Sequence, residues 1–218
     1  MRQSSGSRRP ADLGEACVRE AMAIIDQNGL EALSLREVAR RLGVSHQAPY
    51  KHFPSRDHLV AELVRRAFAD FAHHLDTNPP GGDPDRDLAA MGGAYLDYAH
   101  AHPLHYRLMF GTPLPNPADH PAMLQAARHA FSLLCDTLAR RHTDATGQQV
   151  TVDDDRIRLD ALFIWSAMHG LASIREAPAL DTLDLPPELL QAATPHVLQR
   201  LGQALIPPHS LTHGPNPR

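Results

Sequence analysis

The chain has 218 residues, of which 43% are hydrophobic and 21% charged, and its formal net charge is −4. This composition provides enough apolar surface for one ordinary domain or two small ones and excludes wholesale disorder. No apolar run approaches the roughly 20 residues that cross a bilayer, and the N-terminus lacks the apolar stretch of a signal peptide. We therefore expect a soluble, cytoplasmic protein with no membrane partner.

The charge is unevenly distributed along the chain. Residues 1–60 contain nine Lys/Arg and seven Asp/Glu, a net charge of +2, which leaves −6 for the remainder. A mildly basic N-terminal part on an acidic body is compatible with a DNA-binding end and a separate second domain.

The N-terminal third has the pattern of four helices. Apolar residues recur at helical spacing over 11–27, and Asn28-Gly29 ends that helix. Shorter helices are predicted over 34–42 and 45–52. Ser55 is a suitable N-cap for a longer helix whose apolar positions are Leu59, Leu63, Phe68, Phe71 and Leu75.

The Asn-Pro-Pro-Gly-Gly-Asp-Pro run at 78–84 is the clearest linker. Beyond it the pattern predicts helices at 85–101, 103–110, 118–142, 153–176 and 187–204, with loops at 111–117 and 143–150. The predicted fold class is all-α, with an N-terminal three-helix part and a C-terminal helical part. The expected boundaries are a flexible basic arm (1–10), the helix-turn-helix domain (11–54), a connecting helix (55–77), the C-terminal domain (78–206) and a disordered tail (207–218).

The segment from Leu33 to Phe53 is the most informative part of the sequence. Ser34 followed by Glu37 is a capping box, which predicts a helix start with two backbone amides satisfied. Gly43 permits the left-handed turn that ends this helix, and Ser45 can cap the next one. A short helix, a glycine turn and a second short helix form a helix-turn-helix, whose second helix enters the major groove of DNA.

The continuation of this segment resembles the signature of TetR/AcrR-family repressors. The matching residues are Gly43-Val44-Ser45, Tyr50, His52-Phe53 and Ser55-Arg56-Asp57, in the family's spacing. The resemblance implies that His46, Gln47 and Ala48 face base edges, and that the backbone of DNA is contacted by Ser34, Arg36, Ser45, Tyr50, Lys51, His52 and Arg56.

Several of these assignments have alternatives. Gln47 has the chemistry for a bidentate contact to adenine. Lys51 either reaches a phosphate or points to solvent, and Phe53 is expected in the core. Pro49 departs from the apolar residue of many relatives, which leaves the tilt of the reading helix open. Arg8 and Arg9 either grip DNA as an arm or form a solvated tail.

The C-terminal part contains no catalytic motif and carries a second resemblance. Tyr106–Gly111 and Trp165–Ala172 look like the regulatory domain named for its W-H-G residues. In the TetR family the last two long helices pair with those of a second copy, so the resemblance implies a homodimer on a palindromic operator. Aromatic and sulfur-bearing side chains are the candidates for an effector pocket: Met91, Tyr95, Tyr98, Tyr106, Met109, Phe110, Phe131, Cys135, Phe163, Met168 and His169.

Metal and redox chemistry are the weaker hypotheses. His102 and His105 can share one helical face, but Pro103 interrupts the segment and no Cys or carboxylate completes a clear set, so no metal site and no cofactor is predicted. Cys17 and Cys135 are far apart in the chain and are expected to be buried, reduced thiols. A thiol switch is the alternative.

The prediction is a ligand-responsive DNA-binding repressor, with double-stranded DNA and a small-molecule effector as partners. An activator of the same architecture is an alternative, because the sign of regulation depends on operator position. An enzyme is disfavoured, because no nucleophile–base pair appears. A helical interaction module is also disfavoured, because it leaves the pattern from Gly43 to Arg56 without a reason.

Overall fold

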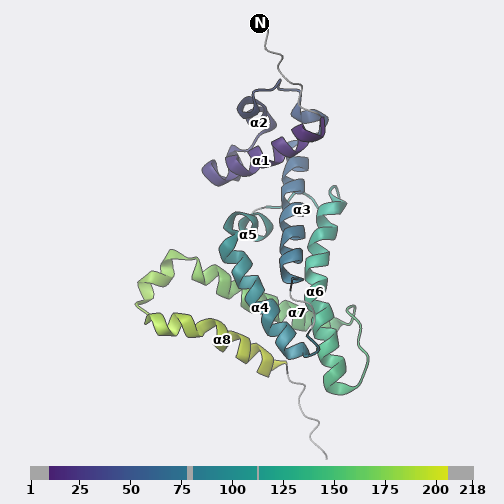
Figure 1. The fold of residues 1–218 in the computed structure, drawn as a ribbon, viewed down its shortest axis with the longest axis vertical. Helices are drawn as coiled ribbons and strands as arrows, with labels where there is room; N and C mark the ends of the chain where they lie inside the picture. Colours follow the sequence, from purple (N-terminus) through teal and green to yellow (C-terminus); the bar gives the residue numbers. More distant parts are fainter. Residues whose placement is uncertain (1–9, 78–80, 112, 206–218) are drawn as a thin grey trace, which may run out of the picture. The chain divides into compact units, whose positions relative to one another are not determined.

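The computed structural model describes residues 10–77, 81–111 and 113–205, which form eight α-helices and three 3₁₀ helices without a β-strand (Figure 1). The predicted basic arm, with Arg8 and Arg9, and the predicted tail lie outside these ranges, apart from Pro10. Within them no helix combines the length and apolar character needed to span a membrane.

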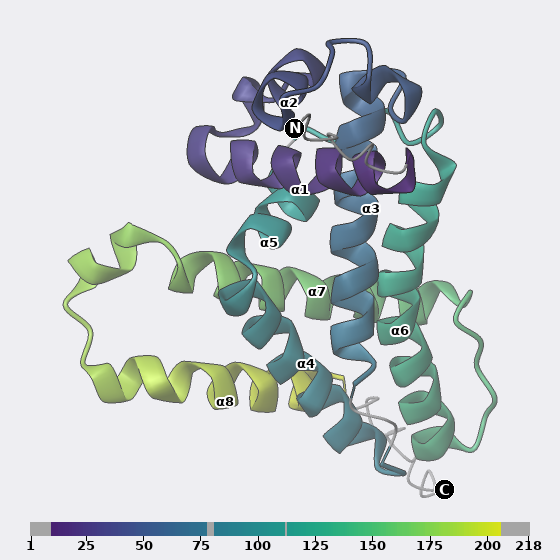
Figure 2. The same ribbon diagram turned by 45° about the horizontal axis from the view of Figure 1, so that its top comes forward.

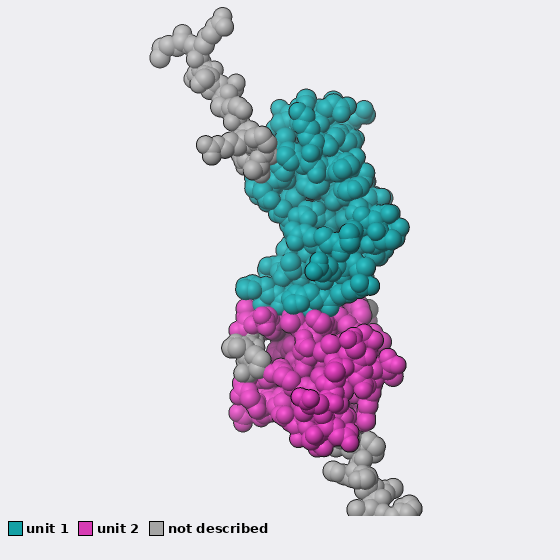
Figure 3. Space-filling model, turned by 90° about the vertical axis from the view of Figure 1, so that its right-hand side faces the viewer, with its two compact units in different colours: residues 1–74, 101–130 teal, residues 75–100, 131–218 magenta. Residues whose placement is uncertain are grey.

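The backbone divides into two compact units (Figure 3). Unit 1 comprises residues 1–74 and 101–130, and unit 2 comprises residues 75–100 and 131–218. The helices in chain order are α1 (Pro10–Asn28), α2 (Leu35–Leu42), α3 (Arg56–Leu75), α4 (Pro84–Ala101), α5 (Pro103–Phe110), α6 (Pro121–Thr146), α7 (Asp155–Arg175) and α8 (Pro187–Ala204). The 3₁₀ helices are η1 (Leu30–Ala32), η2 (Pro49–Lys51) and η3 (Pro178–Leu183).

Prolines mark many of the helix starts. Pro84, Pro103, Pro121 and Pro187 are each the first residue of a helix. Proline is tolerated there because the first-turn amides have no partner within the helix and its fixed φ suits the helix. This explains why α5 and α8 begin at the predicted residues. By contrast α6 begins at Pro121 and continues to Thr146, into the segment predicted as a loop.

Unit 1 is built around α1, α2 and α3, and α1 crosses α3 in Figure 2. One apolar stripe of each helix is buried, and the fully buried side chains of this core include Cys17, Ile24, Ile25, Val38, Leu59 and Leu63. Glu15 of α1 forms an ion pair with Arg66 of α3 at 2.6 Å, and Arg66 also pairs with Glu62 of its own helix at 2.6 Å. The pairing with Glu15 and Glu62 raises the pKa of Arg66. Charge pairing therefore reinforces the packing of α1 on α3.

Unit 2 consists of α4, the C-terminal part of α6, and α7 and α8. Its core is centred on Tyr98, Leu138, Ile157, Ala161 and Met168, all buried. Glycine permits a close approach of α4 and α8, because a Cβ at Gly92 would lie 2.5 Å from Cδ2 of Leu198. Cys135 is buried here and Cys17 in unit 1, and burial raises the pKa of both thiols, so the prediction of free buried thiols is confirmed.

Candidate nucleic-acid interface and regulatory unit

The first helix of the helix-turn-helix, α2, has the predicted ends. The backbone amide of Glu37 donates to Oγ of Ser34 at 3.1 Å. Gly43 adopts φ 65° and ψ 30°, the left-handed conformation expected of a C-cap glycine. Only one half of the capping box forms, however, because the carboxylate of Glu37 binds two arginines rather than the amide of Ser34.

Those two arginines, Arg40 and Arg41, are held by side chains of unit 1. Arg40 forms two hydrogen bonds of 2.7 Å to Glu37, and Arg41 donates to it at 3.0 Å. These bonds lower the pKa of Glu37 to about 2. Arg41 also reaches Gln27 at 2.9 Å and Asn28 at 3.1 Å, which ties α2 to the end of α1. The bonds from Arg41 to the end of α1 were not foreseen from the sequence, because they depend on how α2 packs against α1.

The second helix of the motif differs from the prediction. A regular helix over 45–52 was expected, but the structure has turns followed by the single 3₁₀ turn η2. Pro49 explains the difference, since it has no N–H for the carbonyl of Ser45 and its ring disfavours the preceding helical turn. The amide of Ala48 bonds to that carbonyl instead, at 2.9 Å.

This short segment presents polar side chains on its outer edge. Ser45, His46, Gln47 and Lys51 are exposed, and Tyr50 is 46% exposed. Pro49 is buried and anchors the segment from within, while Ala48 is half-buried. Of the three residues predicted to face base edges, His46 and Gln47 are therefore exposed and Ala48 is partly accessible. Ser34 and Arg36 are exposed as well.

Two predicted phosphate contacts have partners within unit 1. The guanidinium of Arg56 donates to the carbonyl of Leu33 at 3.0 Å and to that of Leu30 at 2.8 Å. His52 packs beside α1, where a Cβ at Gly14 would lie 3.2 Å from its Nδ1. Arg56 thus fastens the start of α3 to the η1 turn. The sequence does not predict these bonds, because any residue can supply a backbone carbonyl.

The predicted effector residues are divided between the two units. Tyr106, Met109 and Phe110 belong to unit 1, and the others belong to unit 2. In unit 2 the hydroxyl of Tyr95 lies 3.3 Å from Nδ1 of His169, whose pKa is lowered by burial. Tyr98 and Cys135 are buried in the core, whereas Phe163 is 48% exposed on α7.

Two cavities of modest size lie among the described residues of unit 2. One, of about 290 Å³, has a mainly apolar lining from α4, α7 and α8 that includes Gly92, Ile164, Met168 and Leu198. The other, of about 260 Å³, lies between α4 and α6 and is lined by Met91, Leu133 and several charged side chains. Among the predicted effector residues, Met91 and Met168 thus line cavities.

An apolar surface follows α7 and α8. The exposed large side chains are Leu159, Leu162, Phe163 and Ile174 on α7, and Leu189 and Leu190 on α8. Leu159 is 66% exposed, and three further large apolar side chains are exposed on the same helix. Such a group of exposed apolar residues is unusual. Exposed apolar side chains gathered on one helix, as on α7, are typical of an interaction site.

The comparisons with known proteins agree with this architecture. Residues 18–63, which span the helix-turn-helix, match the family described as "Bacterial regulatory proteins, tetR family". Residues 88–201 match "Tetracyclin repressor-like, C-terminal domain", and this second match covers more than half of the chain. The chain belongs to the TetR family. As a TetR-family regulator it has a C-terminal domain of the WHG type, as the sequence predicted.

Individual relatives extend the similarity over most of the chain. The uncharacterized HTH-type transcriptional regulator Rv0681 of Mycobacterium tuberculosis is 28% identical over 177 residues, which cover 81% of this chain and 76% of the relative. The HTH-type transcriptional repressor KstR of Rhodococcus jostii is 35% identical over 66 residues, 29% of each chain. The crystal structure of the regulatory protein SCO4313 superposes with a TM-score of 0.69 at 26% identity, covering 93% of this chain and all of that one.

These similarities establish the coarse function. Relatives and structural neighbours are transcriptional regulators rather than enzymes, so the chain is a DNA-binding transcriptional regulator. TetR-family regulators bind DNA and small-molecule effectors, often as dimers. The exposed edge around Gln47 lies within the part matched by the N-terminal family.

Proposed function

We propose that the protein is a homodimeric repressor, which binds a palindromic operator and releases it when a small molecule enters the C-terminal domain. The observation that carries the proposal is the exposed polar edge of the helix-turn-helix, with Gln47 and Tyr50 accessible beside a buried Pro49. In this proposal residues 11–54 read DNA, 55–77 connect, and 78–206 regulate and dimerise.

The DNA contacts divide into base edges and phosphates. His46, Gln47 and Ala48 approach the major groove, where Gln47 forms a bidentate contact with an adenine. Ser34, Arg36, Ser45, Tyr50, Lys51 and His52 contact the phosphate backbone on either side and fix the register. Arg56 acts chiefly through the carbonyls of Leu30 and Leu33, by holding the start of α3 in place.

The apolar surface on α7 and α8 supports the homodimer. Covering Leu159, Leu162 and Phe163 is favourable, since burying apolar area contributes about 25 cal/mol per Å². A second copy of the same surface is the natural cover, because two-fold interfaces are self-complementary. Such a dimer presents two reading segments to successive major grooves, so the operator is an inverted repeat with half-sites about one helical turn apart.

The cavity of about 290 Å³ between α4, α7 and α8 is the effector site that we propose. Its volume suits a small and largely apolar molecule, since ligand pockets begin at about 300 Å³. Met168 and Leu198 are flexible enough to enlarge it. A ligand that prefers the dimer with wrongly spaced reading segments must lower operator affinity, because the two binding equilibria are linked.

Selection of DNA from a pool of genomic fragments tests this proposal. We expect the recovered sequences to share an inverted repeat, and the protein to repress a reporter placed behind it. Recovery of single, unrepeated half-sites would contradict the dimeric reading, and activation of the reporter would contradict repression. A screen of small apolar molecules against the protein–DNA complex then identifies the effector. A Met168→Trp variant, which fills the cavity, is expected to lose the response to it.

A further inference from the structure

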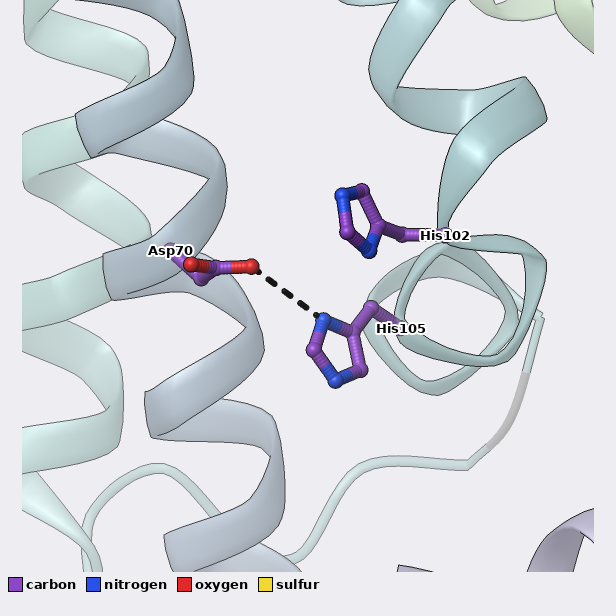
Figure 4. Close-up of side chains that lie close together, drawn as sticks. All are labelled: Asp70, His102 and His105. Carbon is purple, nitrogen blue, oxygen red and sulfur yellow. Dashed lines mark ion pairs between the residues drawn. The ribbon is translucent and has the colours of Figure 1, made fainter.

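Asp70, His102 and His105 lie together in unit 1 (Figure 4). Asp70 is on α3, His102 immediately precedes α5, and His105 is in the first turn of α5. One potential ligand atom from each residue lies within 4.8 Å of the other two. Helices separated in sequence thus bring two imidazoles and a carboxylate to one point.

The spacing of Asp70 and His105 is close to that of two ligands of one metal ion. Oδ2 of Asp70 lies 3.5 Å from Nδ1 of His105. The rings of His102 and His105 are nearly parallel, with an interplanar angle of 13° and centroids 5.6 Å apart. Ligand atoms around a tetrahedral Zn²⁺ with bonds of 2.0–2.1 Å are about 3.3 Å apart. The Asp70–His105 pair already has nearly this spacing, and the exposed side chain of His102 can close the rest by rotation.

The chemistry of the three groups selects the kind of metal. Two imidazoles and one carboxylate suit Zn²⁺ and neighbouring first-row ions, whereas Mg²⁺ and Ca²⁺ prefer oxygen ligands throughout. Asp70 supplies the carboxylate that the sequence around His102 and His105 does not contain.

An open hollow of about 590 Å³ leads to the cluster. Asp70, His73 and His105 are among the residues that line it, together with Val18 and Leu63. An ion can therefore reach the ligands from solvent, and water can occupy the position that three protein ligands leave open.

We propose that Asp70, His102 and His105 bind one divalent transition-metal ion, for which Zn²⁺ is the best fit, with water completing the coordination. The bound ion joins α3 to α5 within unit 1. This inference does not depend on the proposed repressor function, because the binding and its test involve neither DNA nor effector.

Metal titration of the full-length, tag-free protein tests the proposal. After dialysis against a chelator, the protein is titrated with Co²⁺ and then with Zn²⁺. We expect one saturable equivalent of Co²⁺ with the visible absorption of a four-coordinate ion, and its displacement by Zn²⁺ but not by Mg²⁺. Calorimetry gives the Zn²⁺ affinity, and the melting temperature is expected to rise on binding.

Variants separate this site from the other histidines of the chain. His102→Ala and His105→Ala are expected to weaken Zn²⁺ binding at least about tenfold, since even groups that only orient metal ligands contribute about 10- to 100-fold. Asp70→Asn is expected to weaken it similarly, whereas His196→Ala, at an exposed position on α8, leaves it unchanged. Circular dichroism confirms that each variant is folded. Absence of one-to-one binding, or equal binding by wild type and His105→Ala, would overturn the proposal.

Discussion

Arg56 allows a sharp test of the structure of the DNA-binding end, because the family resemblance and the structure suggest different roles for it. The resemblance implies a phosphate contact. In the structure its guanidinium donates to the carbonyls of Leu33 and Leu30 at 3.0 and 2.8 Å. Replacement by alanine removes both bonds, and replacement by lysine keeps the charge but not the planar fork that reaches two carbonyls.

The magnitude follows from these two bonds. A hydrogen bond from a charged donor contributes about 1.5–3 kcal/mol. The side chain is 38% exposed and the carbonyl of Leu30 also accepts from the amide of Leu33, so water and this second donor reduce the loss. We expect Arg56→Ala to lower the free energy of unfolding by about 1.5 kcal/mol, or about 3–6 °C in melting temperature for a chain of this size.

Thermal unfolding followed by far-UV circular dichroism measures this effect. Arg56→Lys is expected to lose at least half as much stability as Arg56→Ala. Lys51→Ala, which removes an exposed cation of the same segment, is expected to melt with the wild type. If Arg56→Ala melted with the wild type and weakened DNA binding while Arg56→Lys restored it, the phosphate role would be correct and our reasoning refuted.

Four further predictions follow from other parts of the chain. Phe163→Glu is expected to convert the dimer to a monomer in light scattering. Thr151→Glu, outside the apolar surface, is expected to leave the dimer intact. If the Phe163→Glu variant were still a dimer, the interface would lie elsewhere. Gly43→Ala is expected to lower the free energy of unfolding by about 1–2 kcal/mol, because φ is 65° at this position. A Cβ there would meet no atom within 4 Å, so the loss comes from backbone strain alone, and an unchanged melting temperature would refute it. Glu37 has a pKa lowered from 4.5 to about 2, so its contribution to stability is complete above pH 4.5 and lost as the pH falls to about 2. Glu37→Gln should therefore melt below the wild type at pH 7 and with it near pH 2, and a gap that persists in acid would contradict this cause. Lys51 is the only lysine of the chain, so mass spectrometry can follow the acylation of its amine. Operator DNA is expected to slow this acylation, and equal rates with and without DNA would show that Lys51 does not contact DNA.

The sequence predicts the helices well where local signals dominate. The starts of α5 and α8 follow from prolines at their first residues, and the end of α2 follows from Gly43. The segment 45–52 was predicted wrongly as a regular helix, because the family pattern outweighed the missing N–H of Pro49. The exposure of His46, Gln47 and Tyr50 agrees with the family pattern, whereas their contact with DNA stays a prediction.

Interactions between distant residues escaped the sequence. The metal hypothesis lacked a carboxylate because Asp70 approaches His105 only through the packing of α3 against α5. The partners of Arg56 are backbone carbonyls, which no side-chain pattern can reveal. For the effector, aromatic and sulfur-bearing residues were predicted as a group. Four of the eight in unit 2 are buried in the core (Tyr95, Tyr98, Cys135 and Met168), and this distinction depends on tertiary structure.

The most direct test of the central claim is fluorescence anisotropy with DNA recovered in the selection, or taken from immediately upstream of the protein's own gene. The wild type and a Gln47→Ala/Tyr50→Ala double variant are titrated at two salt concentrations, with scrambled DNA as the control. The account predicts selective binding that weakens as salt rises, and a loss of about tenfold or more in the double variant, since one bidentate base contact contributes about 1–3 kcal/mol. Binding without selectivity, or equal selective binding by the variant, would contradict the claim that this edge reads DNA.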